Sequence, residues 1–213
     1  FMAYPKVSVD FETTDNLFAS ATNTQSDTLW RIRPELSIES GWSRNALSAY
    51  VRGAFTRYND FTTEDTDIFG AGFQTRLDAA RFSSLEFGAD YSDGFEPRTS
   101  PGSPGTNVDP IDYRQTNVFG SFSHQSNRTT ISSRADWRGY DYDDGFTVLN
   151  SVIDQDFRDR EVVSLTGRVS YEVSPATSWF VQGTVNSRKY DSGAVWDSDG
   201  HEVLAGVAFE VTR

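Results

Sequence analysis

Apolar and polar residues alternate with a period of two along most of this chain. From Val163 to Val173, the odd positions hold Val, Leu, Gly, Val, Tyr and Val, and the even positions hold Ser, Thr, Arg, Ser and Glu. A period of two is the spacing of side chains on one face of a β-strand. The pattern recurs at 7–11, 30–38, 47–55, 69–77, 85–91, 118–122, 131–137, 179–185 and 203–211. We therefore expect about ten strands and no amphipathic helix.

The length of these segments and the charges within them favour a membrane setting. Most segments run past the ~5–6 residues usual in soluble sheets, toward the ~9–11 that cross a bilayer at a tilt. Their polar faces carry ionised side chains at mid-strand, such as Arg33, Arg52 and Arg168. A soluble sandwich would keep such charges on its outer face, whereas a membrane barrel turns them inward to a wet lumen.

The connections between the expected strands distinguish these two folds. Short links at about 41–45, 79–83, 125–128 and 174–177 alternate strictly with long links at about 19–27, 59–67, 92–114, 140–160 and 191–201. This alternation is typical of outer-membrane barrels, which have tight periplasmic turns and long extracellular loops. We predict an all-β, antiparallel, up-and-down transmembrane β-barrel in a Gram-negative outer membrane, with residues 1–213 forming one barrel domain.

The composition excludes several classes of function. The chain has no Cys and only two His, so disulfide frameworks, thiolate zinc sites and cysteine nucleophiles are ruled out and histidine chemistry is poorly supplied. No stretch approaches the ~18 apolar residues of a membrane helix. The net charge of −12 argues against nucleic acid as the main partner. We expect neither a cofactor nor a bound metal, and we expect a protein that is not an enzyme.

Four tryptophans fit the positions of two membrane-interface belts. Trp30 and Trp42 are both at even positions, which point to the same face of a strand, and they are twelve residues apart. At ~3.3 Å per residue and a ~40° tilt, they are separated by roughly 30 Å along the membrane normal, as two girdles flanking a ~25 Å apolar band would be. Trp137 and Trp179 fit the same belts, although tryptophan is also common in apolar cores.

The polar faces of the expected strands supply the candidate solute contacts. In a water-filled channel, guanidinium donors and carboxylate acceptors can exchange hydrogen bonds with sugar hydroxyls or acidic sugars and can set ion selectivity. Alternatively, these residues pair across neighbouring strands and only fill the lumen. The candidates are Arg31, Arg33, Glu35, Arg52, Arg76, Glu86, Arg134, Asp136, Arg138, Arg168 and Arg188.

The long links concentrate acidic residues, among them Asp141, Asp143 and Asp144. Carboxylates facing an anionic lipopolysaccharide layer could be bridged by divalent ions, or they could simply be solvated loop charges. Two other functions stay open at this point. One is a structural or adhesive barrel that presents these acidic loops. The other is an omptin-like surface protease, because His201 follows Asp197 and Asp199 near the expected extracellular rim.

Short motifs occur in order at 15–19, 26–27, Pro34, 40–44, Tyr58, 64–65, 100–105, 127–128, 158–160 and 171–175. Together they resemble the putative β-barrel porin 2 family of Gram-negative outer membranes. The resemblance implies a large barrel, often encoded near exopolysaccharide genes, that serves as an export porin for a polysaccharide. It also implies that this chain matches the first part of such a barrel and lacks its closing strands. Residues 209–213 likewise end without the terminal aromatic residue that usually closes an outer-membrane barrel.

Overall fold

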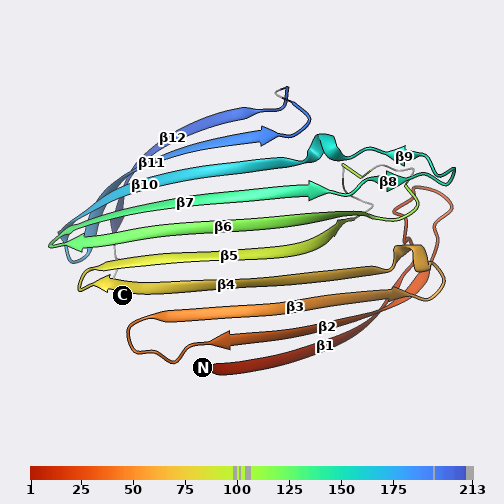
Figure 1. The fold of residues 1–213 in the computed structure, drawn as a ribbon, viewed down its shortest axis with the longest axis horizontal. Helices are drawn as coiled ribbons and strands as arrows, with labels where there is room; N and C mark the ends of the chain where they lie inside the picture. Colours follow the sequence, from red (N-terminus) through yellow and green to blue (C-terminus); the bar gives the residue numbers. More distant parts are fainter. Residues whose placement is uncertain (98–99, 101, 104–106, 194, 210–213) are drawn as a thin grey trace.

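Ten long strands form one antiparallel sheet in the computed structural model of this chain (Figure 1). The structure describes residues 1–97, 100, 102–103, 107–193 and 195–209. The strands follow one another in the order β1-β2-β3-β4-β5-β6-β7-β10-β11-β12, an up-and-down meander. Their bounds are β1 Met2–Thr14, β2 Asp27–Glu39, β3 Ala46–Tyr58, β4 Thr66–Ala80, β5 Ser83–Glu96, β6 Ile111–Ser126, β7 Thr129–Tyr142, β10 Arg160–Ser174, β11 Thr177–Tyr190 and β12 Ser198–Phe209.

The long connections contain small elements that the alternating pattern does not predict. A second sheet consists of β8 (Gly145–Phe146) and β9 (Val152–Ile153), both within the connection between β7 and β10. Two 3₁₀ turns cover Thr62–Glu64 and Asp156–Arg158. In the described part of the chain, no helix has the length and apolar character needed to span a membrane.

The predicted fold class is confirmed, and the strand ends are where the prediction was least accurate. The observed strands extend past the alternating segments, so the long connection predicted at 92–114 narrows to 97–110 and the one predicted at 140–160 narrows to 143–159. Backbone pairing continues in these extensions although the apolar alternation has stopped, because a strand ladder is held by main-chain hydrogen bonds. Parts of the 100–105 motif and residues 210–213 lie outside the described residues.

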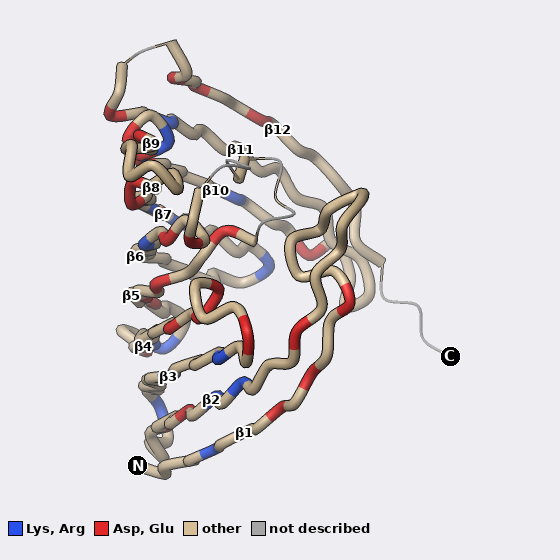
Figure 2. Tube along the Cα trace, turned by 90° about the vertical axis from the view of Figure 1, so that its right-hand side faces the viewer, with Lys and Arg blue, Asp and Glu red and all other residues tan. Residues whose placement is uncertain are grey.

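The sheet curves into an open arc and is not closed into a barrel. Figure 2 looks along the strands from the end that carries the long connections, and it shows β1 and β12 at the two ends of the arc. Within the described residues, β1 pairs only with β2 and β12 pairs only with β11. Both edge strands therefore present backbone groups that another strand could pair with.

Strand register keeps alternate residues of the strands on opposite faces of this arc. Val9 lies opposite Ile32, and Leu165 lies opposite both Ala135 and Val185. The apolar residues of each strand therefore lie beside apolar residues of the neighbouring strands. We call their alternating positions the apolar parity and the positions between them the polar parity. This face is exposed rather than buried between two sheets, and Leu165 retains 52% exposure. The predicted orientation, with apolar side chains on the outside and charged ones on the inside, therefore agrees with the sheet geometry.

The polar parity occupies the concave face of the arc. A cavity of about 770 Å³ is lined by residues of six successive strands, from Lys6 on β1 to Tyr113 on β6. Side chains from strands so far apart in the sheet can line one cavity only on the concave side. The polar side chains thus converge toward the axis around which the sheet curves.

A small buried cluster joins two long connections at one end of the sheet. Ile111 is 1% exposed, and its Cδ1 atom lies only 2.5 Å from where a Cβ atom on Gly145 would be. Asn107 forms an isolated bridge with Thr147, and the amide of Val108 donates to the carbonyl of Phe146. Residues 107–111 are therefore packed against residues 145–147 of the connection between β7 and β10.

Candidate functional site

The concave polar face is the candidate functional surface, because it gathers charged side chains from nine of the ten long strands, with β6 contributing uncharged residues such as Asn117 and Ser121. All eleven residues predicted to line a lumen occupy the polar parity of their strands, as the pairing of β1–β7 and β10–β12 requires. They are Arg31, Arg33, Glu35, Arg52, Arg76, Glu86, Arg134, Asp136, Arg138, Arg168 and Arg188. That they line a lumen and contact a solute stays a prediction.

Several of these arginines are held by carboxylates of the same face. Arg31 lies 3.0 Å from Glu12 across the β1–β2 pair, and Arg33 forms a neighbouring ion pair with Asp10. On β7, Arg134 lies 2.8 Å from Asp136 of its own strand. All these side chains remain partly exposed, so each pair contributes little to stability, on the order of 0–1 kcal/mol. The pairs fix the positions of the guanidinium groups while leaving them accessible to solvent.

Arginine stacking on inward aromatic rings is a feature that the sequence analysis missed. The guanidinium of Arg168 lies 3.8 Å from the ring centroid of Phe180, and that of Arg134 lies 4.1 Å from the centroid of Phe119. Both rings lie on the polar parity, where alternation alone would not assign an aromatic residue. A guanidinium over an aromatic face is favourable and stiffens a long side chain. The inward face therefore combines flat apolar rings with oriented charged donors.

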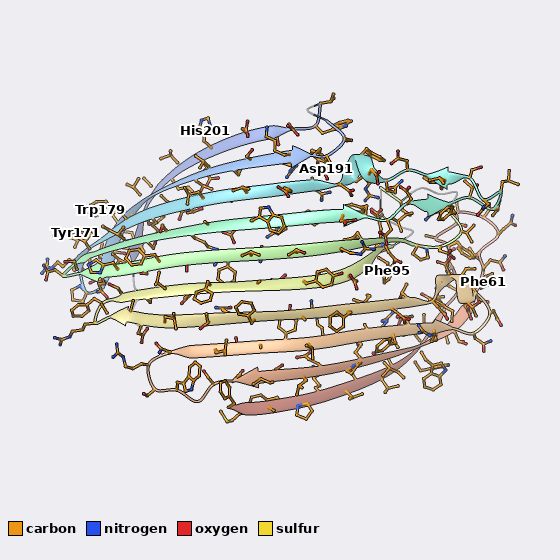
Figure 3. The ribbon with its side chains drawn as sticks, viewed as in Figure 1. Phe61, Phe95, Tyr171, Trp179, Asp191 and His201 are labelled. Atoms are coloured by element: carbon orange, nitrogen blue, oxygen red, sulfur yellow. The ribbon has the colours of Figure 1, made fainter. Side chains whose placement is uncertain are left out.

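The four predicted interface tryptophans lie toward the two ends of the strands. Trp30 and Trp137 are near the ends of β2 and β7 that carry long connections, whereas Trp42 and Trp179 are at or beside short turns. Figure 3 shows Trp179 beside Tyr171 at the short-turn end, with ring centroids 5.8 Å apart. Trp30 packs similarly on Phe11, at 4.8 Å. That these tryptophans form two membrane-interface belts stays a prediction.

Acidic residues of the long connections accept hydrogen bonds from strand ends, a role that the sequence analysis did not consider. The amides that end β3, β7 and β11 all belong to tyrosines, and each donates to the aspartate immediately before the next long strand. Tyr190 N donates to Asp197 at 2.9 Å, and this bond together with the ion pair to Lys189 lowers the pKa of Asp197. The other two pairs are Tyr58 N with Asp65 at 2.8 Å and Tyr142 N with Asp159 at 2.7 Å.

Three further carboxylates converge in the connection between β7 and β10. Oxygens of Asp144, Asp154 and Asp156 lie within 4.8 Å of one another on the exposed surface. The neighbouring negative charges of Asp144 and Asp154 raise the pKa of Asp156. Asp144 also accepts the amide of Gln155, and Asp154 accepts the amide of Asp156, so both serve the local backbone.

The geometry of β12 does not support the protease alternative. His201 is the fourth residue of β12 and lies opposite Val185, on the apolar parity (Figure 3). Asp197 is engaged by Lys189 and by the amide of Tyr190. General acid–base work needs a histidine and a carboxylate that face a common polar site. The structure places His201 on the face opposite the polar cavity instead.

The fold and its two faces define a class of protein: a porin-like β-barrel of the outer membrane. The chain belongs to the family described as Putative beta-barrel porin 2, whose family model matches residues 1–213. This confirms the resemblance drawn from the short motifs. Comparison with curated proteins found no match.

Among solved structures, the chain is similar to one described as "Copper transporter OprC". The TM-score is 0.49 and the sequence identity is 9%. The alignment covers 96% of this chain and 37% of that chain, so the present chain spans little more than a third of its length.

Proposed function

We propose that this protein forms a channel for the passive passage of a hydrophilic solute across the outer membrane of a Gram-negative bacterium. The observation that carries the proposal is the concave polar face, on which residues of six successive strands line one cavity of about 770 Å³. Charged donors and acceptors on a water-filled lumen replace part of the hydration of a polar solute while it passes. No step in this function requires a cofactor.

The class of solute that suits this face best is a carbohydrate chain, and we propose an exported polysaccharide. Phe119 and Phe180 offer flat rings, and Arg134 and Arg168 lie over those rings as forked donors. Sugar rings present an apolar face together with hydroxyl groups, so such a surface can contact both parts of the solute. The family resemblance independently favours polysaccharide export.

Closure of the lumen requires strands beyond the β1–β12 arc, and we propose that further strands pair with both of its edges. Every backbone polar group in the hydrocarbon region must be hydrogen-bonded, so an open edge cannot face lipid. The chain has no Cys, which makes introduced cysteine pairs unambiguous reporters. Cysteines placed on β1 and β12 should fail to form a disulfide in the membrane-inserted protein, whereas a pair such as Val9→Cys with Ile32→Cys should form one.

The conductance of the purified full-length protein in planar bilayers tests the channel. We expect open-channel currents that respond to an inward substitution such as Arg168→Glu. The matched outward substitution Val169→Thr should leave the current unchanged, because Val169 lies on the apolar face of the same strand. Absence of any conductance from correctly inserted protein would contradict the proposed function. Equal effects of the two substitutions would contradict the assignment of the faces.

A second candidate function, adhesion through the long connections, is favoured by one observation. Val148 and Leu149 are each 85% exposed at the tip of the β8–β9 hairpin, surrounded by an acidic connection. Solvent-exposed apolar tips of this kind can serve as contact points for a partner surface. Replacing both residues with Ser should abolish surface binding if adhesion is the function, and should leave conductance unchanged in either case.

A further inference from the structure

The short-turn end of the concave face holds a second cavity with a different character from the first. It measures about 680 Å³, and its rim is formed by the turns 40–45 and 81–82 together with the neighbouring ends of β4–β7. Three arginines line it, namely Arg44, Arg76 and Arg81, and Asp78 is its one acidic lining residue among those described. We call this cavity the rim pocket. Its remaining polar lining comes from Ser83, Ser84, Ser123, Gln125 and Thr130.

The positive charge of the rim pocket is only partly neutralised. Arg76 lies 3.2 Å from Asp78, whereas Arg44 donates only to the main-chain carbonyl of Asp78, at 3.3 Å. Arg81 lies over the ring of Phe82 at 5.3 Å. In the described part of the chain, neither Arg44 nor Arg81 forms an ion pair with a carboxylate. Two guanidinium groups thus remain available to an anion from solution.

The two ends of the sheet differ in charge, and the rim pocket lies at the positive end. The four short turns, 40–45, 81–82, 127–128 and 175–176, contain three arginines and no carboxylate. The long connections 59–65, 143–159 and 191–197 contain ten Asp and Glu residues against a single arginine. Such a gradient along a lumen concentrates anions at the short-turn end and repels them from the opposite end.

We propose that the rim pocket is a binding site for a solute that bears carboxylate or phosphate groups. Planar guanidinium groups match the two oxygens of a carboxylate or phosphate, and the surrounding hydroxyl and amide groups match sugar hydroxyls. As a place where solute enters the lumen, the site rests on the proposed channel function. In that role it captures an acidic carbohydrate at the side where the short turns lie, which in an outer-membrane barrel is the periplasmic side.

Calorimetric titration of the full-length protein in detergent micelles tests the site without relying on conductance. Inorganic phosphate and glucuronate are the probes, with glucose as the uncharged reference. We expect at least one of the two anions to bind, and added salt to weaken that binding. Arg44→Gln and Arg81→Gln should each weaken it by about threefold to fivefold, the range of an exposed ion pair. The two anions distinguish a phosphorylated from a carboxylated solute.

Two further variants separate a specific site from general charge or misfolding. Asp78→Asn removes the competing carboxylate, so it should strengthen anion binding by about twofold to fivefold, a gain that misfolding cannot produce. Arg128→Gln is the matched control, because Arg128 lies in another short turn outside the rim pocket and donates to the carbonyl of Val173. Binding of neither anion, or equal losses from Arg81→Gln and Arg128→Gln, would overturn the proposal.

Conductance measurements keep the two proposals distinguishable. A protein that conducts but binds neither anion retains the channel function and loses the rim site. A protein that binds anions through Arg44 and Arg81 but never conducts retains the rim site and loses the channel function.

Discussion

The ion pair between Glu96 and Arg158 should control how firmly the connection 143–159 is held at the long-loop end. Arg158 donates to the two carboxylate oxygens of Glu96 at 2.6 and 2.9 Å, and Ser100 donates to the same carboxylate at 2.6 Å. The guanidinium also lies 4.0 Å from the ring centroid of Tyr142. The pair joins residues separated by 62 positions, so it fastens the connection to the end of β5.

The substitution Glu96→Gln should open this connection strongly, because it leaves the Arg158 charge without its partner. The two side chains are only 14% and 10% exposed. Removing one member of a buried pair costs about 3–5 kcal/mol, and the remaining exposure favours the lower end, about 3 kcal/mol. A loss of that size increases the population of the open connection by about a hundredfold. Amide hydrogen exchange of residues 143–159 in lipid nanodiscs measures it directly.

Two further variants give this prediction its controls. Asp143→Asn breaks the pair with Arg114, which has an N–O distance of 3.0 Å but exposures of 48% and 44%, so exchange should change by less than about fivefold. Combining Glu96→Gln with Arg158→Gln removes the unpaired charge and should recover most of the protection. The reasoning is refuted if Glu96→Gln changes exchange no more than Asp143→Asn does.

Three other outcomes follow from the geometry. Gly145→Ala should loosen the packing of the two long connections, because the alanine Cβ would lie 2.5 Å from Ile111 Cδ1. Faster amide hydrogen exchange in both connections would show this loosening. The pKa of Asp197 is lowered in the folded protein. The ionised carboxylate therefore stabilises the fold fully at pH values above the ordinary aspartate pKa near 3.8, and this stabilisation is lost as the pH falls through the lower pKa of the folded state. Asp197→Asn should remove that acid-dependent fraying of β11. Leu165→Arg should destabilise the inserted protein by about 2–4 kcal/mol in urea titrations, whereas Thr166→Arg, on the polar face, should be tolerated.

The faces of the strands could be predicted because they depend on a local rule. A one-residue shift of any strand would move its whole apolar set to the other side, so alternation and register must agree along the entire sheet. Arg168 and Val169 show this directly, since adjacent residues occupy opposite faces throughout β10. The strand ends could not be predicted in the same way, because the main-chain ladder continues where side chains no longer alternate.

Contacts between distant segments were beyond sequence reasoning for a different physical reason. The Glu96–Arg158 pair and the packing of Ile111 against Gly145 depend on two connections meeting at one end of the sheet. No spacing in the sequence encodes that meeting. The arginine–aromatic stacks on the polar face were missed because alternation sorts residues by polarity alone, and Phe180 sits on the face where polarity assigns hydrophilic residues.

The aspartates at the strand ends do carry a readable signal. Tyr58 precedes Asp65 by seven residues, and Tyr190 precedes Asp197 by the same seven, with a basic residue directly before each tyrosine. Both aspartates accept the tyrosine amide, and both pair with that basic residue, Arg57 or Lys189. The repeat thus identifies a hairpin-closing motif in which one carboxylate satisfies a strand-end amide and neutralises an adjacent cation. Part of the acidity of the long connections therefore serves to end the strands that flank them.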